Sequence, residues 1–237
     1  MTGQRVEALF FDVFGTVVDW RCGVARGLEE ALAPKGHALD WQAMALAWRE
    51  RYQPAMAAVR EGRRPFVKLD VLHRENLLSV LDAFGVEGLG AAEIDEINLA
   101  WHRLDPWPDV PAGLARLKKR YILASLSNGN VRLMVDMARR AGLPWDAILG
   151  AEPARAYKPS PEAYRRSIAF LDLEPSACMM VAAHNGDLAA ARAVGMRTAF
   201  VARPHEYGPG QATDLAPAAE WDMVAEDFGE LAHRLGC

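Results

Sequence analysis

The chain has 237 residues and a formal net charge of −4, and 51% of its residues are hydrophobic and 24% charged. This composition is that of an ordinary globular protein, and it excludes a disordered chain, a collagen-like fibre and a small disulfide scaffold. At roughly 100–200 residues per domain, the length predicts one domain with a sizeable insertion, or two modest lobes.

The mild acidity provides no overall field that would draw the chain onto nucleic acid or anionic lipid. Two short basic stretches, residues 60–64 and 118–120, are interpreted as solvated helix ends and loops. Three widely spaced cysteines without a CxxC pair favour a reducing compartment. The N-terminal residues contain no apolar signal core, and no stretch approaches the ~18 apolar residues of a membrane span. We therefore expect a cytoplasmic protein with neither nucleic-acid nor membrane partners.

The first expected element is a strand over residues 6–11, a short apolar run that ends at Asp12, with a turn at Gly15. From about residue 23 to residue 107 apolar residues recur at helical spacing. We expect four helices in this segment, around residues 28–32, 41–48, 69–84 and 94–101. Pro54 is expected to kink or end the second of them.

Residues 105–109 are rich in helix breakers, and strands and helices alternate beyond them. Strands are expected over residues 121–126, 147–150, 177–183, 198–202 and 222–225. Helices are expected over residues 111–119, 131–140, 161–171 and 188–194, and a last helix after the final strand is expected to end at residue 235. Apolar strands between helices indicate an open parallel sheet covered on both faces. The sequence thus predicts an α/β protein with a Rossmann-like parallel-sheet core, in residues 1–20 and 108–237, and a helical domain inserted over residues 21–107.

Ligands of open parallel sheets bind at the carboxyl ends of the strands. Reading off those ends of the expected strands, and the loop before the helix at residue 161, gives one convergent polar set: Asp12, Thr16, Ser127, Asn128, Lys158, His184 and Asp187.

These residues lie in four segments: residues 11–16, 127–129 and 158–159, and the acidic segment that ends at Asp187. In order and position, the four segments resemble the signature motifs of the haloacid dehalogenase superfamily. The helical insert falls where that family places its cap. Most members are phosphatases whose first motif reads Asp-x-Asp, with the second aspartate as general acid and base. Here Phe14 occupies that position, and Ala182-Ala183 replaces a Gly-Asp pair that supplies a Mg²⁺ ligand. Both changes argue against phosphoryl transfer.

Both departures are found in the 2-haloacid dehalogenase branch, which this chain resembles in lacking that metal site. The resemblance implies a short 2-haloalkanoic acid as substrate and no metal or other cofactor. Asp12 would attack the halogen-bearing carbon, form an aspartyl ester with inversion and release halide. Water would then release a 2-hydroxyalkanoic acid. Lys158 would keep Asp12 ionised, Asp187 would hold Lys158, and Thr16 would orient Asp12.

The same resemblance implies the groups that bind the substrate. Ser127 and Asn128 would orient Asp12 and bind the substrate carboxylate. Arg49, on the second helix of the insert, would stabilise the departing halide, and the alternative for it is an exposed helix arginine. Phe14 and Tyr164 would line the substrate site.

One departure from the dehalogenase pattern leaves alternatives open. That branch commonly has Ser-x-Asn where this chain has Ala182 and His184. The His184 imidazole either holds or activates the hydrolytic water, or is a satisfied histidine at the strand end. Asp187 is the other candidate base. The alternative functions are a small-molecule phosphatase or phosphonatase, and a catalytically silent binding protein. An apolar insert is compatible with a homodimer.

Overall fold

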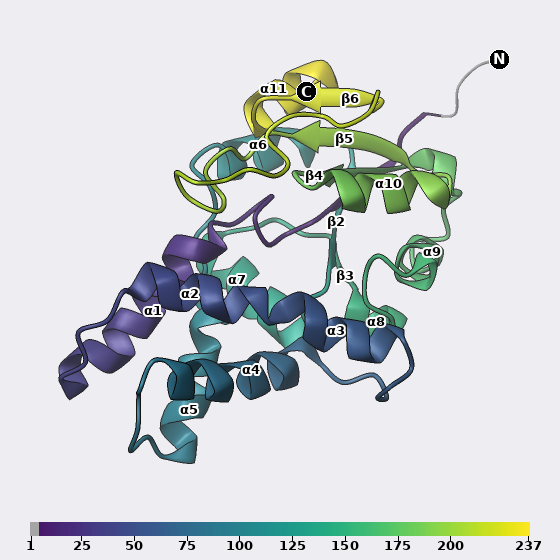
Figure 1. The fold of residues 1–237 in the computed structure, drawn as a ribbon. Helices are drawn as coiled ribbons and strands as arrows, with labels where there is room; N and C mark the ends of the chain where they lie inside the picture. The colour runs from purple at the N-terminus through teal and green to yellow at the C-terminus, as the bar shows by residue number, and fades with distance from the viewer. Residues whose placement is uncertain (1–4) are drawn as a thin grey trace.

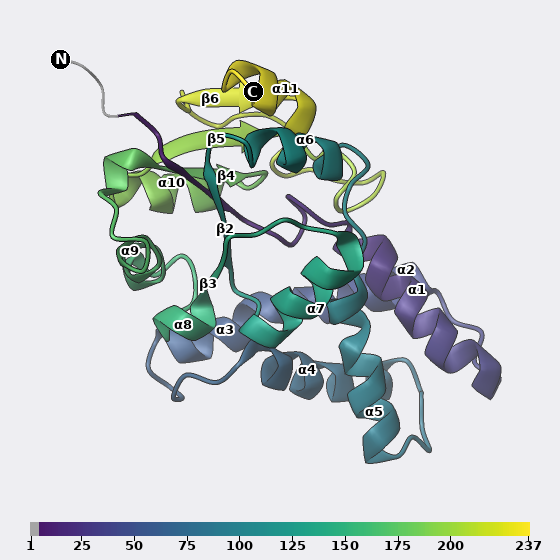
Figure 2. The same ribbon diagram turned by 180° about the vertical axis from the view of Figure 1, so that it is seen from behind.

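The computed structural model describes residues 5–237, in which six parallel strands form one sheet with helices on both faces (Figures 1 and 2). The strands are β1 (Ala8–Phe11), β2 (Ile122–Ser127), β3 (Ala147–Gly150), β4 (Cys178–Ala182), β5 (Arg197–Val201) and β6 (Met223–Ala225). Their order is β3-β2-β1-β4-β5-β6, so β1 lies in the middle between β2 and β4. The predicted α/β class and parallel sheet are confirmed. Residues 1–4, which begin the segment expected to lack a signal core, lie outside the described residues.

The two faces of the sheet are covered by different helices (Figures 1 and 2). One face packs against α6 (Val110–Leu117), α7 (Val131–Ala141) and α11 (Phe228–Arg234), and the other against α9 (Pro161–Ala169) and α10 (Asn185–Ala193). In β1, Leu9 and Phe11 belong to the first cluster and Ala8 and Phe10 to the second, so all four side chains are buried. Burial on both faces explains why the strand is apolar without alternation. A four-residue helix after β3, α8 (Ala151–Ala154), was not expected.

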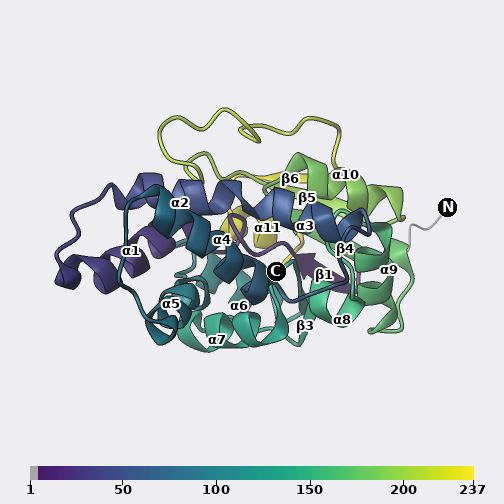
Figure 3. The ribbon, with the colours of Figure 1, turned by 60° about the horizontal axis from the view of Figure 1, so that its bottom comes forward.

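A helical segment connects β1 to the rest of the sheet. It contains α1 (Trp20–Leu32), α2 (Trp41–Glu50), α3 (Tyr52–Arg60), α4 (Leu69–Ala83), α5 (Ala91–Asn98) and a 3-10 helix over Leu99–Arg103, besides a short 3-10 turn at Ala33–Lys35. Figures 1 and 3 show α2, α3 and α4 lying together across one end of the sheet. The boundaries of the two domains stay a prediction.

The predicted second helix is two helices in the structure, α2 and α3, which meet at Arg51. Pro54 lies in the first turn of α3, where its missing N–H costs no intrahelical hydrogen bond. The break therefore falls three residues before the proline. It lies between Arg49 and Tyr52, which both line the cavity described below.

A buried histidine joins the helical segment to the sheet's covering helices. His102 is 4% exposed, with Nε2 3.1 Å from Asp70 Oδ1 and Nδ1 2.9 Å from Asp136 Oδ2. Asp70 lies on α4 and Asp136 on α7, and Asn130 Nδ2 donates to Asp70 Oδ2 at 2.8 Å. Burial alone would lower the pKa of His102, but the two aspartates raise it above its ordinary value. Asp70 and Asp136 have lowered pKa values: the bonds from His102 to Asp70 outweigh burial, and Arg132 and His102 both bond Asp136.

We expect this cluster to stabilise the fold most at mildly acidic pH. The contribution of His102 is complete below its ordinary pKa of 6.5 and is lost as the pH rises through the higher folded pKa. The contribution of the aspartates is complete above their ordinary pKa of 3.8 and is lost as the pH falls through the lower folded values. Urea unfolding at about pH 6 and about pH 9 measures the effect. His102→Gln should reduce the difference between the two pH values, and the exposed control His233→Gln should not; equal pH dependence in all three proteins would contradict the assignment.

Candidate active site

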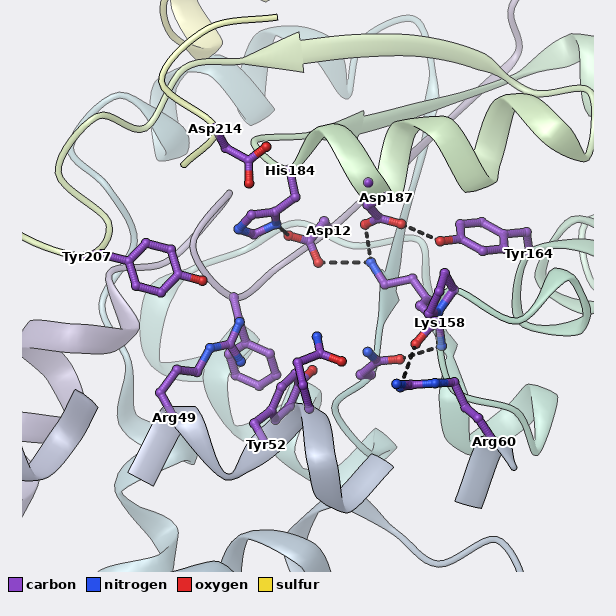
Figure 4. Close-up of a pocket in the computed structure, with 15 residues that line it drawn as sticks. Asp12, Arg49, Tyr52, Arg60, Lys158, Tyr164, His184, Asp187, Tyr207 and Asp214 are labelled. Carbon is purple, nitrogen blue, oxygen red and sulfur yellow. Dashed lines mark hydrogen bonds and ion pairs between the residues drawn. The ribbon is translucent and has the colours of Figure 1, made fainter. Parts of the chain in front are cut away.

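A cavity of about 440 Å³ lies between the carboxyl ends of the central strands and the helices α2 and α3 (Figure 4). The sheet side contributes Asp12 and Phe14 after β1, Asn128 after β2, Lys158 and Tyr164 from the α8–α9 region, and His184 and Asp187 after β4. The helical segment contributes Arg49, Tyr52, Gln53 and Arg60, and the loop over residues 202–222 contributes Tyr207 and Asp214. Figure 4 shows these side chains converging from opposite sides. The predicted convergence of strand ends therefore occurs around Asp12.

Asp12 has partners for both of its carboxylate oxygens. Lys158 Nζ donates to Oδ1 at 2.9 Å, Thr16 Oγ1 donates to Oδ2 at 2.8 Å, and His184 Nδ1 lies 3.0 Å from Oδ2. Burial alone would raise the pKa of Asp12, but the charges on Lys158 and His184 outweigh burial and hold the pKa well below its usual range. The structure thus presents an ionised, aimed carboxylate at the cavity wall. Such a group suits nucleophilic attack.

Lys158 is held between two carboxylates. Its ammonium bonds Asp187 as well as Asp12, and the other oxygen of Asp187 accepts from Tyr164 Oη at 2.5 Å. Burial would lower the pKa of Lys158, but the two aspartates raise it above its ordinary value, so the ammonium stays charged. Burial raises the pKa of Asp187 in spite of the adjacent ammonium. The sequence placed these three groups together correctly, and Tyr164 contacts Asp187 from the cavity wall.

His184 bridges Asp12 to a residue that the sequence did not single out. Its Nε2 lies 2.8 Å from Oε2 of Glu206, which is 1% exposed and stands on the loop after β5. Burial would lower the pKa of His184, but the carboxylates of Glu206 and Asp12 raise it well above 6.5. The imidazole is therefore a cation between two carboxylates. Neither ring nitrogen is left without a partner.

The Arg49 guanidinium brings a positive charge to the cavity wall, and one of its N–H donor groups has no acceptor among the described residues. Its guanidinium carbon lies 4.2 Å from the ring centroid of Tyr52 and 5.2 Å from that of Trp20, which holds the cation over aromatic faces. Its Nη1 is buried and has no hydrogen-bond partner among the residues the structure describes. A buried N–H group without an acceptor is costly and suits an incoming anion. Arg49 is thus not the exposed helix arginine of the alternative reading.

Three other predicted residues shape the wall in different ways. Phe14 is 2% exposed and packs edge-on against Trp101 with ring centroids 5.6 Å apart. The Asn128 side chain lines the cavity and accepts from the Lys158 backbone N–H at 2.8 Å. Ser127 is fully buried, and its hydroxyl accepts from Gly129 N at 3.0 Å. The structure brings Phe14 and Asn128 to the cavity but places the Ser127 hydroxyl behind it, inside the turn.

Sequence reasoning missed residues of α3 and of the loop after β5, among them Tyr52 and Tyr207, which line the cavity, and Glu206, which contacts His184. Tyr52 follows Arg49 by three residues, so helical spacing was an available signal for it. Glu206 and Tyr207 lie in an irregular loop with no periodic pattern, and no signal identified them. Arg60 lies at the end of α3, as expected for the basic stretch at residues 60–64, and it also lines the cavity and donates to the Lys158 carbonyl at 3.3 Å.

Two kinds of structural feature are absent from the part of the chain that the structure describes. Within residues 5–237, no group of three or more histidine, cysteine, aspartate or glutamate side chains is arranged to hold a metal ion. In the same part of the chain, no helix combines the length and apolarity needed to cross a bilayer.

Known proteins resemble this chain over nearly its whole length. (S)-2-haloacid dehalogenase 4A of Burkholderia cepacia is 28% identical over 237 residues, which are 97% of this chain and 99% of the relative. The crystal structure of the defluorinating L-2-haloacid dehalogenase Rha0230 is 50% identical with a TM-score of 0.97 and covers 100% of this chain and 97% of its own. That of the L-2-haloacid dehalogenase PA0810 is 47% identical with a TM-score of 0.94, covering 98% and 99%.

The family-level match covers strands β1 to β4 and the helical segment between β1 and β2. Residues 6–195 match the family model of haloacid dehalogenase-like hydrolases, and this range contains all four sequence motifs. The predicted superfamily is confirmed: this protein belongs to the haloacid dehalogenase-like hydrolases.

Proposed function

We propose that this protein hydrolyses short 2-haloalkanoic acids to 2-hydroxyalkanoic acids through an ester on Asp12, without a metal. One observation carries the proposal: the ionised Asp12 carboxylate, held by Lys158 at 2.9 Å, lines the same cavity as Arg49, whose buried Nη1 has no hydrogen-bond partner among the described residues. A nucleophile and an anion-binding cation on opposite walls are what displacement of a halide requires. The names of the relatives that are 50% and 47% identical support the same reaction.

In the first step one oxygen of Asp12 attacks the halogen-bearing carbon from the side opposite the halogen. The new C–O bond forms as the carbon–halogen bond breaks, so the carbon inverts and the halide leaves with the bonding electrons. Lys158 and Thr16 fix the carboxylate during attack, and Arg49 receives the charge that develops on the halide. Asn128 and the backbone of its turn bind the substrate carboxylate.

In the second step water attacks the carbonyl carbon of the Asp12 ester. The bond from that carbon to the alkyl oxygen breaks, the 2-hydroxy acid leaves, and one oxygen from water stays in Asp12. The step needs a base, which His184 or Asp187 provides.

The two alternative functions explain less of the site. A phosphatase would need a proton donor where Phe14 packs in the aromatic wall. A silent binding protein would have no reason to bury Asp12 and Lys158, because isolated buried charges cost several kcal/mol each before their partners offset that cost.

Asp12→Asn should abolish halide release, because an amide is a poor nucleophile. Halide release from chloroacetate, bromoacetate and fluoroacetate is measured by ion chromatography, with p-nitrophenyl phosphate as the control substrate. The wild-type protein should release halide and no phosphate, and it should place ¹⁸O from labelled water into Asp12 in a single turnover. Steady turnover by Asp12→Asn, or phosphate release that a chelator stops, would contradict the proposal.

Arg49→Met should lower kcat by about 10²–10³-fold, the usual effect of removing one donor to a developing charge. The matched control is Arg51→Met, since the Arg51 guanidinium donates to the Ala47 carbonyl at 2.9 Å. Steady-state halide release measures both variants. Equal rates for Arg49→Met and Arg51→Met would remove Arg49 from the mechanism.

A further inference from the structure

Glu206 is a buried charged residue that the proposed reaction does not yet use. It is 1% exposed, and its two oxygens have different partners: Oε2 faces His184 Nε2 at 2.8 Å, and Oε1 accepts from Trp20 Nε1 at 2.8 Å. Consecutive hydrogen bonds and ion pairs connect Trp20 to Glu206, Glu206 to His184, and His184 to Asp12. Glu206 therefore lies one imidazole away from the nucleophile.

The turn after Asp12 is shaped around this carboxylate. A Cβ atom at Gly15 would lie 2.1 Å from Glu206 Oε1, and the φ angle of Gly15 is +89°, so both space and backbone conformation require glycine there. The Gly15 carbonyl accepts from Trp107 Nε1 at 2.8 Å, which fixes the turn from its other side. The Glu206 carboxylate is thus built into the wall of the site by the turn, α1 and its own loop. A carboxylate this enclosed has few orientations available.

We propose that Glu206 is a positioning residue that holds the Nε2–H of His184, so that Nδ1, once it has lost its proton after Asp12 is esterified, faces the ester with its lone pair and His184 serves as the base that hydrolyses it. The inference rests on the proposed function and selects between its two candidate bases. A neutral imidazole carries its proton on only one nitrogen, and an acceptor at Nε2 decides which. Without that acceptor the proton can reside on Nδ1, where the ring cannot accept a proton from water.

Protons balance over one cycle. At rest His184 is an imidazolium beside ionised Asp12; alkylation of Asp12 removes that negative charge and releases halide, and the Nδ1 proton then leaves to solvent. Water attacks the ester carbon while Nδ1 takes one of its protons, and the same proton passes to the departing alkoxide. Asp12, now a neutral acid, returns its own proton to Nδ1, which restores the resting pair. The sum is haloacid plus water giving hydroxy acid, halide and one proton.

Asp187 is a weaker candidate for this role because esterification of Asp12 frees neither of its oxygens, whereas it removes the anionic partner of His184 Nδ1. One Asp187 oxygen bonds the Lys158 ammonium and the other accepts from Tyr164 Oη at 2.5 Å. Taking a proton from water would require breaking one of these contacts, and would leave Lys158 with a neutral neighbour. His184, by contrast, directly contacts an Asp12 oxygen at 3.0 Å.

The test separates the two chemical steps. Wild type, Glu206→Gln and His184→Asn are mixed with excess chloroacetate and quenched, then analysed for chloride and for a carboxymethyl group on Asp12 by peptide mapping, which also excludes reaction at the exposed Cys22. Both variants should release about one chloride per active site in a fast burst and accumulate the Asp12 ester, with hydrolysis slowed by about 10²–10⁴-fold. Glu220→Gln, an exposed site on the same loop, should behave as wild type.

Each other outcome overturns a different statement. Absence of any chloride from wild type overturns the proposed function and the inference with it. A wild-type rate of ester hydrolysis in Glu206→Gln overturns the role of Glu206, and the same result in His184→Asn overturns His184 as base, while the burst still supports Asp12 as nucleophile. Loss of the burst in Glu206→Gln alone would place Glu206 in alkylation or folding instead.

Discussion

The ion pair between Asp12 and Lys158 is the interaction around which the site is organised. Taking a carboxylate and an ammonium out of water costs several kcal/mol each, and their mutual attraction repays that only when the remaining hydrogen-bonding groups are also satisfied. Here Thr16 and His184 provide the further hydrogen bonds to the Asp12 carboxylate, and Asp187 provides a second carboxylate partner for the Lys158 ammonium. Such a pair needs chain segments far apart in sequence to meet, and the parallel sheet provides this because β1 lies between β2 and β4 with all their carboxyl ends on one edge. The fold and the Asp12–Lys158 ion pair are therefore specified together.

Charges alternate in sign along the whole chain of contacts, from Asp187 through Lys158, Asp12 and His184 to Glu206. Every buried charge thus has an opposite charge next to it, which is the condition under which ionised groups persist in an interior. The series contains three carboxylates, one ammonium and one imidazolium, and the cation of Arg49 on the opposite wall adds a third positive charge. An anionic substrate entering the cavity meets in Arg49 a donor whose Nη1 has no acceptor within residues 5–237. The proposed binding of an anionic substrate therefore does not depend on the overall charge of the protein.

The sequence predicted the sheet side of this arrangement well and the other walls poorly, for physical reasons. Residues that end buried strands can be identified from sequence, because an apolar run such as the one before Asp12 stops at a polar residue. A parallel sheet then brings the carboxyl ends of its strands together. The side chain of Ser127 illustrates the limit of that rule: its position at a strand end was read correctly, yet its hydroxyl serves the turn at Gly129. Glu206 lies in an irregular loop, and only tertiary packing brings it to His184. A residue whose role depends on one contact over 22 positions leaves no periodic trace in a single sequence.

The replacement of the Asn of the dehalogenase pattern by His184 then has a structural explanation in Glu206. An asparagine at this position would be neutral and would leave Glu206 buried with Trp20 as its remaining side-chain donor among the described residues. The Glu206 carboxylate, which is 1% exposed, would then be unfavourable because its one side-chain partner is neutral. Conversely, without Glu206 the imidazolium of His184 would lose the acceptor for its Nε2–H. His184 and Glu206 are therefore expected to be energetically coupled, so that the effect of a substitution at one depends on which residue stands at the other. His184 is best understood as half of a charged pair with Glu206 that lies beside the Asp12 carboxylate.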